Sequence, residues 1–166
     1  ISAHWMTTMI EIDGSLLEGG GQVLRTSIAM SALAGVPVKV TRIRANRENP
    51  GLQAQHLAAV EAVAKITDAE VTGLKRGSST IEFHPKQIKG GLFKIDVGTA
   101  GSIPLVLQAL APVACFAPSG VSLELTGGTD VPWSPTFDYL GLVLIPTIRK
   151  MGGVISAELA RRGHYP

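Results

Sequence analysis

The order of secondary-structure elements predicted from this sequence repeats after about 83 residues, and this repeat constrains the fold more than any other feature. In each half, apolar spacing and β-branched runs predict a strand, a glycine-containing loop, a helix, a second strand, a polar loop and a second helix. Asp13 and Asp96 lie in corresponding first strands, and Val38 and Val121 lie in corresponding second strands; each pair is separated by 83 residues. We therefore expect tandem copies of a β-α-β-α-β-β unit.

The boundary between the two expected units falls near residue 88. We expect residues 1–8 to be a tag or disordered leader, residues 9–88 to form the first unit and residues 89–166 to form the second. Strands are predicted at residues 9–13, 36–43, 69–74, 80–84, 92–97, 121–126 and 154–159, and helices at residues 22–33, 52–67, 103–116 and 136–151. The second unit lacks a last strand, so we expect it to be incomplete and the chain to be a shortened form of a longer protein.

Short strands alternating with helices predict an α/β (α+β mixed) fold, with helices packed on one face of small mixed sheets. With 166 residues and 45% hydrophobic side chains, the chain is long enough to bury a core. No uncharged apolar stretch approaches the roughly 20 residues that a bilayer span needs, so we expect a soluble protein with no membrane partner. The single cysteine, Cys115, lies in an apolar run, and we expect it to be buried in a reducing, cytoplasmic protein.

A glycine loop, residues 14–20, follows the first predicted strand and ends in Glu18-Gly19-Gly20, with Gly21 next. Glycines let backbone N–H groups approach an anion, and the helix that follows adds the positive end of its dipole. Because a carboxylate repels a phosphate, this interpretation requires Mg²⁺ or Mn²⁺ between Glu18 and the anion. The alternative, which the residues alone favour, is a tight turn with an acidic residue near a helix N-terminus. No GK[ST] sequence follows, so the stretch is not a P-loop.

An arginine loop, residues 42–56, runs from the end of the second predicted strand into the start of the next predicted helix. The net charge of +2 does not by itself indicate a nucleic-acid-binding protein, but the arginines of this loop are a local cluster. Arg44 and Arg47 lie in the loop, and Gln55 and His56 lie in the first turn of the next helix. Guanidinium groups match phosphate oxygens well, and both loops are expected at one edge of a sheet. A phosphate site and a set of solvated charges are equally compatible with this pattern.

Two polar features stand out in the second half. Gln108 interrupts an otherwise apolar helix, where a buried amide either bonds neighbouring backbone or contacts a ligand; the structural role is favoured. The loop TGGTDVPWSP occupies the place of the arginine loop in the second unit. Its Thr129 and Asp130 could cap the next turn, whereas Trp133 and Pro135 could line an aromatic or purine pocket.

Five stretches, in this order and at these intervals, resemble the RNA 3′-terminal phosphate cyclase family: IDGSLLEGGGQVLRTS, IRANRENPGLQAQHL, TAGSIPLVLQ, GGTDVPWSPTFDY and RRGHYP. The resemblance covers Met9 to Pro166 and implies repeated β-α-β-α-β-β units in a protein about twice as long. It also implies an enzyme of the ligase class that uses ATP and Mg²⁺ or Mn²⁺. Such an enzyme converts an RNA 3′-phosphate to a 2′,3′-cyclic phosphate through enzyme-AMP and RNA-ppA intermediates.

The resemblance further implies roles for individual residues. Glu18 matches a glutamate near the nucleotide phosphates and the metal, and Gln108 and Pro135 match positions that line the ATP site. Positions implied to bind the terminal RNA phosphate or the ATP phosphates are Arg25, Arg44, Arg47, Gln55 and His56. The nucleophilic histidine of the family is expected beyond Pro166, so no catalytic residue is assigned in this chain. Expected partners are RNA 3′-phosphate ends, ATP, the C-terminal remainder of the protein and, through exposed strand edges and apolar faces, a second copy.

Two alternatives belong to other classes. A cyclase-like protein without cyclase activity would serve ribosomal RNA processing as a binding or assembly factor, and loss of the nucleophilic histidine from the full-length protein would favour it. An enolpyruvyl transferase shares only the unit architecture, and the EGGGQ and IRANRENPGL stretches argue against it.

Overall fold

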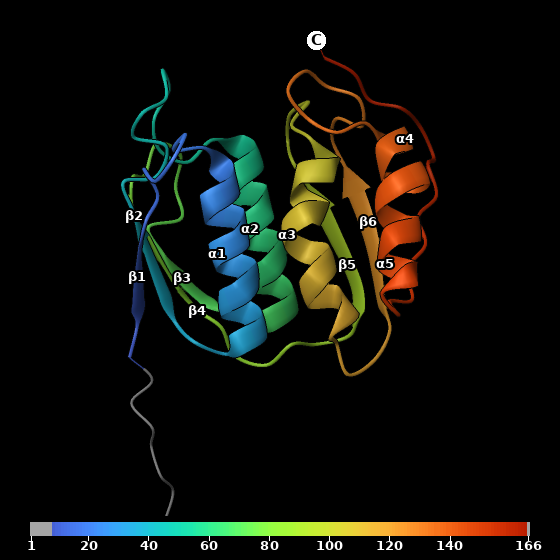
Figure 1. The fold of residues 1–166 in the computed structure, drawn as a ribbon, viewed down its shortest axis with the longest axis horizontal. Helices are drawn as coiled ribbons and strands as arrows, with labels where there is room; N and C mark the ends of the chain where they lie inside the picture. The colour runs from blue at the N-terminus through green and yellow to red at the C-terminus, as the bar shows by residue number, and fades with distance from the viewer. Residues whose placement is uncertain (1–7, 166) are drawn as a thin grey trace, which may run out of the picture.

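The structure is a computed structural model that describes residues 8–165. The predicted leader, residues 1–8, lies outside the described residues except for Thr8. Helices α1 (Gly21–Ala34), α2 (Ala54–Thr67) and α3 (Ile103–Cys115) lie side by side, between the strands of a four-stranded sheet and those of a two-stranded sheet (Figure 1). This arrangement confirms the predicted α/β (α+β mixed) class with small sheets and packed helices.

The first half of the chain contributes a four-stranded mixed sheet made of β1 (Ile10–Asp13), β2 (Val38–Thr41), β3 (Glu70–Thr72) and β4 (Ile81–His84). The strand order is β1-β2-β4-β3; β1 and β2 are parallel, and β4 is antiparallel to β2 and β3. Every second residue of β2 and β4 is buried, so one face of this sheet carries the core.

Helices α1 and α2 cover that face with small and β-branched side chains. Leu24 and Ile28 of α1 are one turn apart and buried, as are Val60 and Val63 of α2. Their burial removes the apolar faces of both helices from water, which is the main source of stability for helices of this length. α1 ends at Gly35, whose φ of 66° lies in the left-handed region that favours glycine.

The second half of the chain contributes two parallel strands, β5 (Gly91–Asp96) and β6 (Val121–Thr126), with α3 connecting them. A last helical segment consists of α4 (Phe137–Tyr139), the π-helical turn η1 (Leu140–Leu144) and α5 (Ile145–Lys150). The turn widens directly before Pro146, which has no N–H and whose ring would clash with the carbonyl of Leu142 in a regular α-helix.

Three sequence-based expectations are wrong. Residues 154–159 form no strand, because β3, their counterpart in the first unit, is held only by β4, and no such neighbour exists among residues 8–165. Val38 and Val121 do lie in corresponding strands, β2 and β6, but the separation of 83 residues does not hold for their register. Val38 pairs with Ile10, whereas the equivalent residue of β5, Phe93, pairs with Leu123 and not with Val121.

The third concerns Cys115. It is exposed rather than buried, because it falls in the last turn of α3 on the side that faces solvent. Within residues 8–165, no helix is both long and apolar enough to cross a bilayer.

The parallel β-α-β connections place all the candidate loops at one end of the molecule. The glycine loop, the arginine loop, the loop before α3 and the loop before α4 lie together in the upper part of Figure 1, where α1 to α4 begin. The N-terminal ends of these helices therefore surround a common region, and the candidate site is built there.

Candidate functional site

The glycine loop is folded back against the arginine loop. Gly14 N–H donates to the carbonyl of Thr41 at 2.7 Å, and the Asn46 side-chain amide donates to the carbonyl of Ser15 at 3.3 Å. Gly20 is the N-cap of α1 and provides no side-chain hydrogen bond to the first turn. The first N–H groups of α1 therefore lack a side-chain acceptor, and the positive end of its dipole faces the region between the loops.

His56 is buried against the start of α1. Its side chain is 4% exposed, and its Nδ1 accepts a hydrogen bond from Gln53 N–H at 3.2 Å. Burial, reinforced by the charges of Arg44 and Arg25, lowers the pKa of His56 to about 4. The ring is therefore neutral near pH 7, and its accepting Nδ1 places the proton on Nε2.

Gly21 is the point at which this histidine meets the first helix. A Cβ placed on Gly21 would lie 2.1 Å from His56 Nε2 and 3.0 Å from Arg25 Nη1. A Cβ on the preceding Gly20 would lie 3.3 Å from Arg47 Nη2. Two guanidinium groups and a neutral imidazole thus surround the first residues of α1. We call Gly20, Gly21, Arg25, Arg47 and His56 the α1 cluster.

Arg25 links this cluster to the second half of the chain. It is buried on α1, and its Nε donates to Gln108 Oε1 on α3 at 3.1 Å. Burial lowers the pKa of Arg25, although a guanidinium still remains charged at physiological pH. Gln108 itself is exposed, so the expectation that its amide is buried is wrong. Its exposed amide lies beside the cluster and is accessible to a ligand.

Arg44 holds the shape of the arginine loop. Its φ is 54°, and its Nη1 donates to the carbonyls of Asn49 and Gly51, the latter at 3.0 Å. Partial burial, together with the charge of Arg47, lowers the pKa of Arg44. Its guanidinium closes the loop that presents Arg47 to Gly20, so it contributes to the cluster through the backbone.

Arg42, in contrast, is paired within the scaffold. Its Nε donates to Asp13 Oδ1 at 3.0 Å, and its Nη2 contacts Asp13 Oδ2. These hydrogen bonds, with those from Ser15, lower the pKa of Asp13 to about 2. The arginines of the loop therefore have distinct partners, and Arg42 is the one tied to the end of β1.

Glu18 is the carboxylate nearest the α1 cluster. Its side chain is 92% exposed, and Arg47 Nη2 lies 3.5 Å from its Oε2. Residues 8–165 contain no group of three or more histidine, cysteine or acidic side chains placed to hold a metal ion. Mg²⁺ usually keeps several waters and takes one or two carboxylates plus oxygens of its ligand, so a single exposed glutamate such as Glu18 could hold such an ion.

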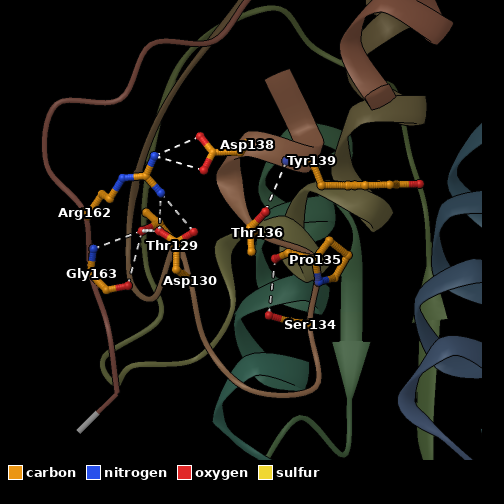
Figure 2. A network of polar contacts seen from close by, with 9 residues as sticks. All are labelled: Thr129, Asp130, Ser134, Pro135, Thr136, Asp138, Tyr139, Arg162 and Gly163. Atoms are coloured by element: carbon orange, nitrogen blue, oxygen red, sulfur yellow. Dashed lines mark hydrogen bonds and ion pairs between the residues drawn. The ribbon is translucent and has the colours of Figure 1, made fainter. Parts of the chain in front are cut away.

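A pocket of about 520 Å³ lies between α3 and the α4 region, next to Gln108. This size is within the range of roughly 300–1,000 Å³ found for small-molecule sites. Its lining residues are Pro104, Leu105, Gln108, Ser134, Pro135, Thr136, Tyr139, Leu140 and Leu144. The structure thus brings together Gln108 and Pro135, two of the predicted site residues, and we call this hollow the α3–α4 pocket. Figure 2 shows Ser134, Pro135, Thr136 and Tyr139 on consecutive parts of the same loop and helix.

The profile of the RNA 3′-terminal phosphate cyclase family matches residues 16–166. The chain belongs to this family. Curated proteins named RNA 3′-terminal phosphate cyclase are 57% identical over 158 residues in Ignicoccus hospitalis, 54% over 157 residues in Pyrobaculum aerophilum and 56% over 158 residues in Pyrococcus furiosus. Each alignment covers 95% of this chain but only 45%, 45% and 46% of the respective relative. The chain therefore spans a little less than half the length of the cyclases it matches.

The site residues that the cyclase resemblance implies fall into three groups in space. Arg25, Arg47 and His56 lie in the α1 cluster, with Arg44 and Glu18 at its border. Gln108 and Pro135 line the α3–α4 pocket. Gln55 lies apart from both, against the loop before α3, because a Cβ on Gly101 in that loop would be 3.2 Å from Gln55 Cβ. Only Arg25 connects the first two groups by a direct side-chain hydrogen bond among the described residues.

Two expectations about the loop before α4 are wrong. The side chains of Thr129 and Asp130 bond to each other and to residues 162–163 and not, among the described residues, to the turn that follows them. Thr136 caps α4, with its Oγ1 accepting from Tyr139 N–H at 3.2 Å. Trp133 has a φ of 63° and is fully exposed outside the α3–α4 pocket, so it does not line it.

Sequence reasoning also missed Arg162, which pairs with two acidic side chains of this loop (Figure 2). The RRGHYP stretch was the available signal, but its partners lie more than twenty residues away and have no local pattern.

Proposed function

We propose that this chain is the N-terminal part of an ATP-dependent RNA 3′-terminal phosphate cyclase. The observation that carries the proposal is the Arg25–Gln108 hydrogen bond of 3.1 Å. It joins a cluster suited to phosphate groups to a pocket large enough for a nucleoside, so one nucleotide could contact both. Relatives at more than half identity that carry the cyclase name support the same activity.

In the proposed reaction, a histidine outside this chain attacks the α-phosphorus of ATP and diphosphate leaves. AMP then passes to an oxygen of the RNA 3′-phosphate, and the neighbouring 2′-OH displaces AMP as the cyclic phosphate forms. Both transfers develop negative charge on phosphate oxygens, so positioning and charge neutralisation are the main requirements. A divalent cation would supply further neutralisation of the phosphate charge.

The residues of this chain have separate tasks in that scheme. Arg25 and Arg47 donate to phosphate oxygens, together with the free N–H groups at the start of α1. Glu18 would hold the divalent cation from the exposed side of the cluster. Gln108 and Pro135 contact the adenosine part of ATP. His56 is neutral and inaccessible as a nucleophile, and it fixes the start of α1 by packing against Gly21.

The test uses the full-length protein that contains this chain. Incubation with labelled ATP and Mg²⁺ or Mn²⁺ should give an acid-labile, hydroxylamine-sensitive protein–AMP adduct, and addition of an RNA 3′-phosphate should convert it to a cyclic end. RNA with a 3′-hydroxyl end is the control and should not react. The 166-residue chain alone should give no adduct, because the nucleophile is expected elsewhere. An adduct without any cyclic RNA product, or no adduct at all, would favour the cyclase-like factor instead.

A further inference from the structure

The last described residues of the chain pack against the loop before α4. Thr129 N–H donates to the carbonyl of Gly163 at 2.8 Å, and Gly163 N–H donates to Thr129 Oγ1 at 3.0 Å. Asp130 and His164 form an isolated parallel bridge. A Cβ on Gly163 would lie 2.5 Å from the carbonyl oxygen of Gly127, so the approach leaves no room for a side chain there. The backbone contact sets the position of Arg162 directly before it.

Arg162 joins the two ends of that loop. Its Nη1 lies 3.1 and 3.0 Å from the carboxylate oxygens of Asp130, and its Nη2 lies 2.8 and 3.1 Å from those of Asp138 (Figure 2). The Asp130 carboxylate is 14% exposed and that of Asp138 is 58% exposed. The planar guanidinium donates to both carboxylates at once through its two Nη atoms. A lysine has a single ammonium nitrogen and cannot reproduce this geometry.

The electrostatics of the network favour the loop geometry in which Arg162 contacts both carboxylates. Hydrogen bonds from Thr129 and then from Arg162 lower the pKa of Asp130, and the pKa of Arg162 is raised by Asp138 and Asp130. Without the guanidinium, two carboxylates would face the same space and repel each other. This repulsion would act against the backbone hydrogen bond of 3.0 Å from Phe137 N–H to the carbonyl of Thr129 and loosen the ends of the loop.

The loop that Arg162 closes also forms one wall of the α3–α4 pocket. Ser134, Pro135 and Thr136 lie between Asp130 and Asp138 and line the pocket opposite Gln108. Local hydrogen bonds also shape the loop: Ser134 Oγ donates to the carbonyl of Val131 at 3.0 Å, and Phe137 N–H donates to the carbonyl of Thr129 at 3.0 Å, which joins its two ends through the backbone. Arg162 adds the side-chain connection between the same two ends, so its contacts contribute to the distance between Pro135 and Gln108.

We infer that Arg162 is a positioning residue for nucleotide binding: it holds the loop that carries Pro135 against Gln108 and thereby sets the affinity for ATP. The inference rests on the proposed function, because it assigns the α3–α4 pocket to ATP. Arg162 itself does not line the pocket, so its effect is indirect.

The test compares Arg162→Ala with Arg161→Ala in the full-length protein. Arg161 is the adjacent exposed arginine and forms no ion pair with the described residues, so its removal matches the change in charge. The Kd for ATP is measured by equilibrium dialysis, and single-turnover adduct formation is followed as a function of ATP concentration. Arg162→Ala should raise the Kd about five- to tenfold, the scale expected for loss of a charged hydrogen-bonded network. Adduct formation at saturating ATP and the KM for RNA 3′-phosphate should change less than twofold.

Arg162→Lys and Asp138→Asn are graded variants that keep part of the network. Each should raise the Kd for ATP by less than Arg162→Ala does. If Arg162→Ala does not fold, these two variants are used for the test in its place. An unchanged Kd in the variants, or an equal change in Arg161→Ala, would overturn the inference and leave the proposed function standing. A general loss of active protein with unchanged KM for ATP would also overturn it, since that is the signature of a purely structural role. A wild-type protein that does not bind ATP would overturn both.

Discussion

Replacing Gly21 with alanine tests the packing of His56 against the start of α1. Gly21 is the first residue of α1, where alanine alone would be favoured over glycine by up to about 1 kcal/mol. The new Cβ, however, would lie 2.1 Å from His56 Nε2 and 2.6 Å from Cδ2. Helix propensity and packing therefore predict opposite signs for the change in stability.

The structure indicates that packing wins. The His56 ring is 4% exposed and held by Gln53 N–H at 3.2 Å, so it has little room to rotate away. Overpacking of this kind costs typically about 1–3 kcal/mol. After a gain in helix propensity of about 1 kcal/mol is subtracted, Gly21→Ala should lower the free energy of unfolding by up to about 2 kcal/mol. Urea denaturation of the full-length protein and its variants measures this value from the shift in midpoint at constant slope.

Two controls isolate the contact. Gly20→Ala places its Cβ 3.3 Å from Arg47 Nη2, at the end of a flexible, 43% exposed side chain, so it should cost less than about 1 kcal/mol. In a His56→Ala background the clash is gone, and Gly21→Ala should be neutral or stabilising. The double-mutant cycle of Gly21→Ala and His56→Ala should therefore show a coupling free energy of at least about 1 kcal/mol between the two positions. A more stable Gly21→Ala protein, or the same loss in both backgrounds, would refute the reasoning.

Three further predictions concern charged groups of the site. Between pH 6.5 and 4 the unfolded chain binds a proton at His56, whereas the folded chain keeps this histidine neutral. The free energy of unfolding should therefore fall by up to about 3 kcal/mol as the pH drops through this range. Urea denaturation at several pH values measures this fall, which should be smaller in His56→Gln. Glu18→Gln should raise the half-saturating Mg²⁺ concentration in adduct formation several-fold with no change in stability, since its side chain is 92% exposed. Arg44→Ala should weaken adduct formation and the use of RNA 3′-phosphate together, because the Arg44 guanidinium closes the loop that presents Arg47 to Gly20; a loss in RNA use alone would assign Arg44 to the RNA phosphate.

Local pattern was sufficient for most of the helices and strands. The helix predicted at residues 22–33 is α1, Gly21–Ala34, because Leu24 and Ile28 lie on the face that the sheet buries. Residues 154–159 have the same alternation as a strand, yet none forms. Strand formation requires a neighbour, and the presence of a neighbour is not encoded in the segment itself.

The register of the second strand could not be predicted for a related reason. Side chains alternate with a period of two along a strand, so a shift by two residues keeps every apolar side chain on the same face. Val121 and Leu123 therefore satisfy the pattern equally well as the counterpart of Val38. The pairing of Phe93 with Leu123 decides between them.

Residue types at the site were predictable, but their partners were not. Arg42 and Arg44 lie two positions apart in the same loop, yet Arg42 pairs with Asp13 and Arg44 donates to backbone carbonyls. The choice depends on which side of the loop faces β1, a property of the tertiary structure. The exposure of Gln108 was missed for the same reason, because it depends on how α3 packs against α1.

The two halves of the site differ in a way that orients the proposed nucleotide. Arg25 and Gln108 are 83 residues apart, the same separation as Asp13 and Asp96, so the hydrogen bond joins corresponding positions of α1 and α3. At the start of α3, Ser102 Oγ accepts from Leu105 N–H at 3.2 Å, whereas Gly20 leaves the start of α1 without such a bond. The cationic side chain and the open helix end therefore lie on α1, and the neutral amide and the capped end lie on α3. Since a free N-terminus and a guanidinium favour anions, we infer that the phosphates of ATP lie at α1 and its base lies toward α3.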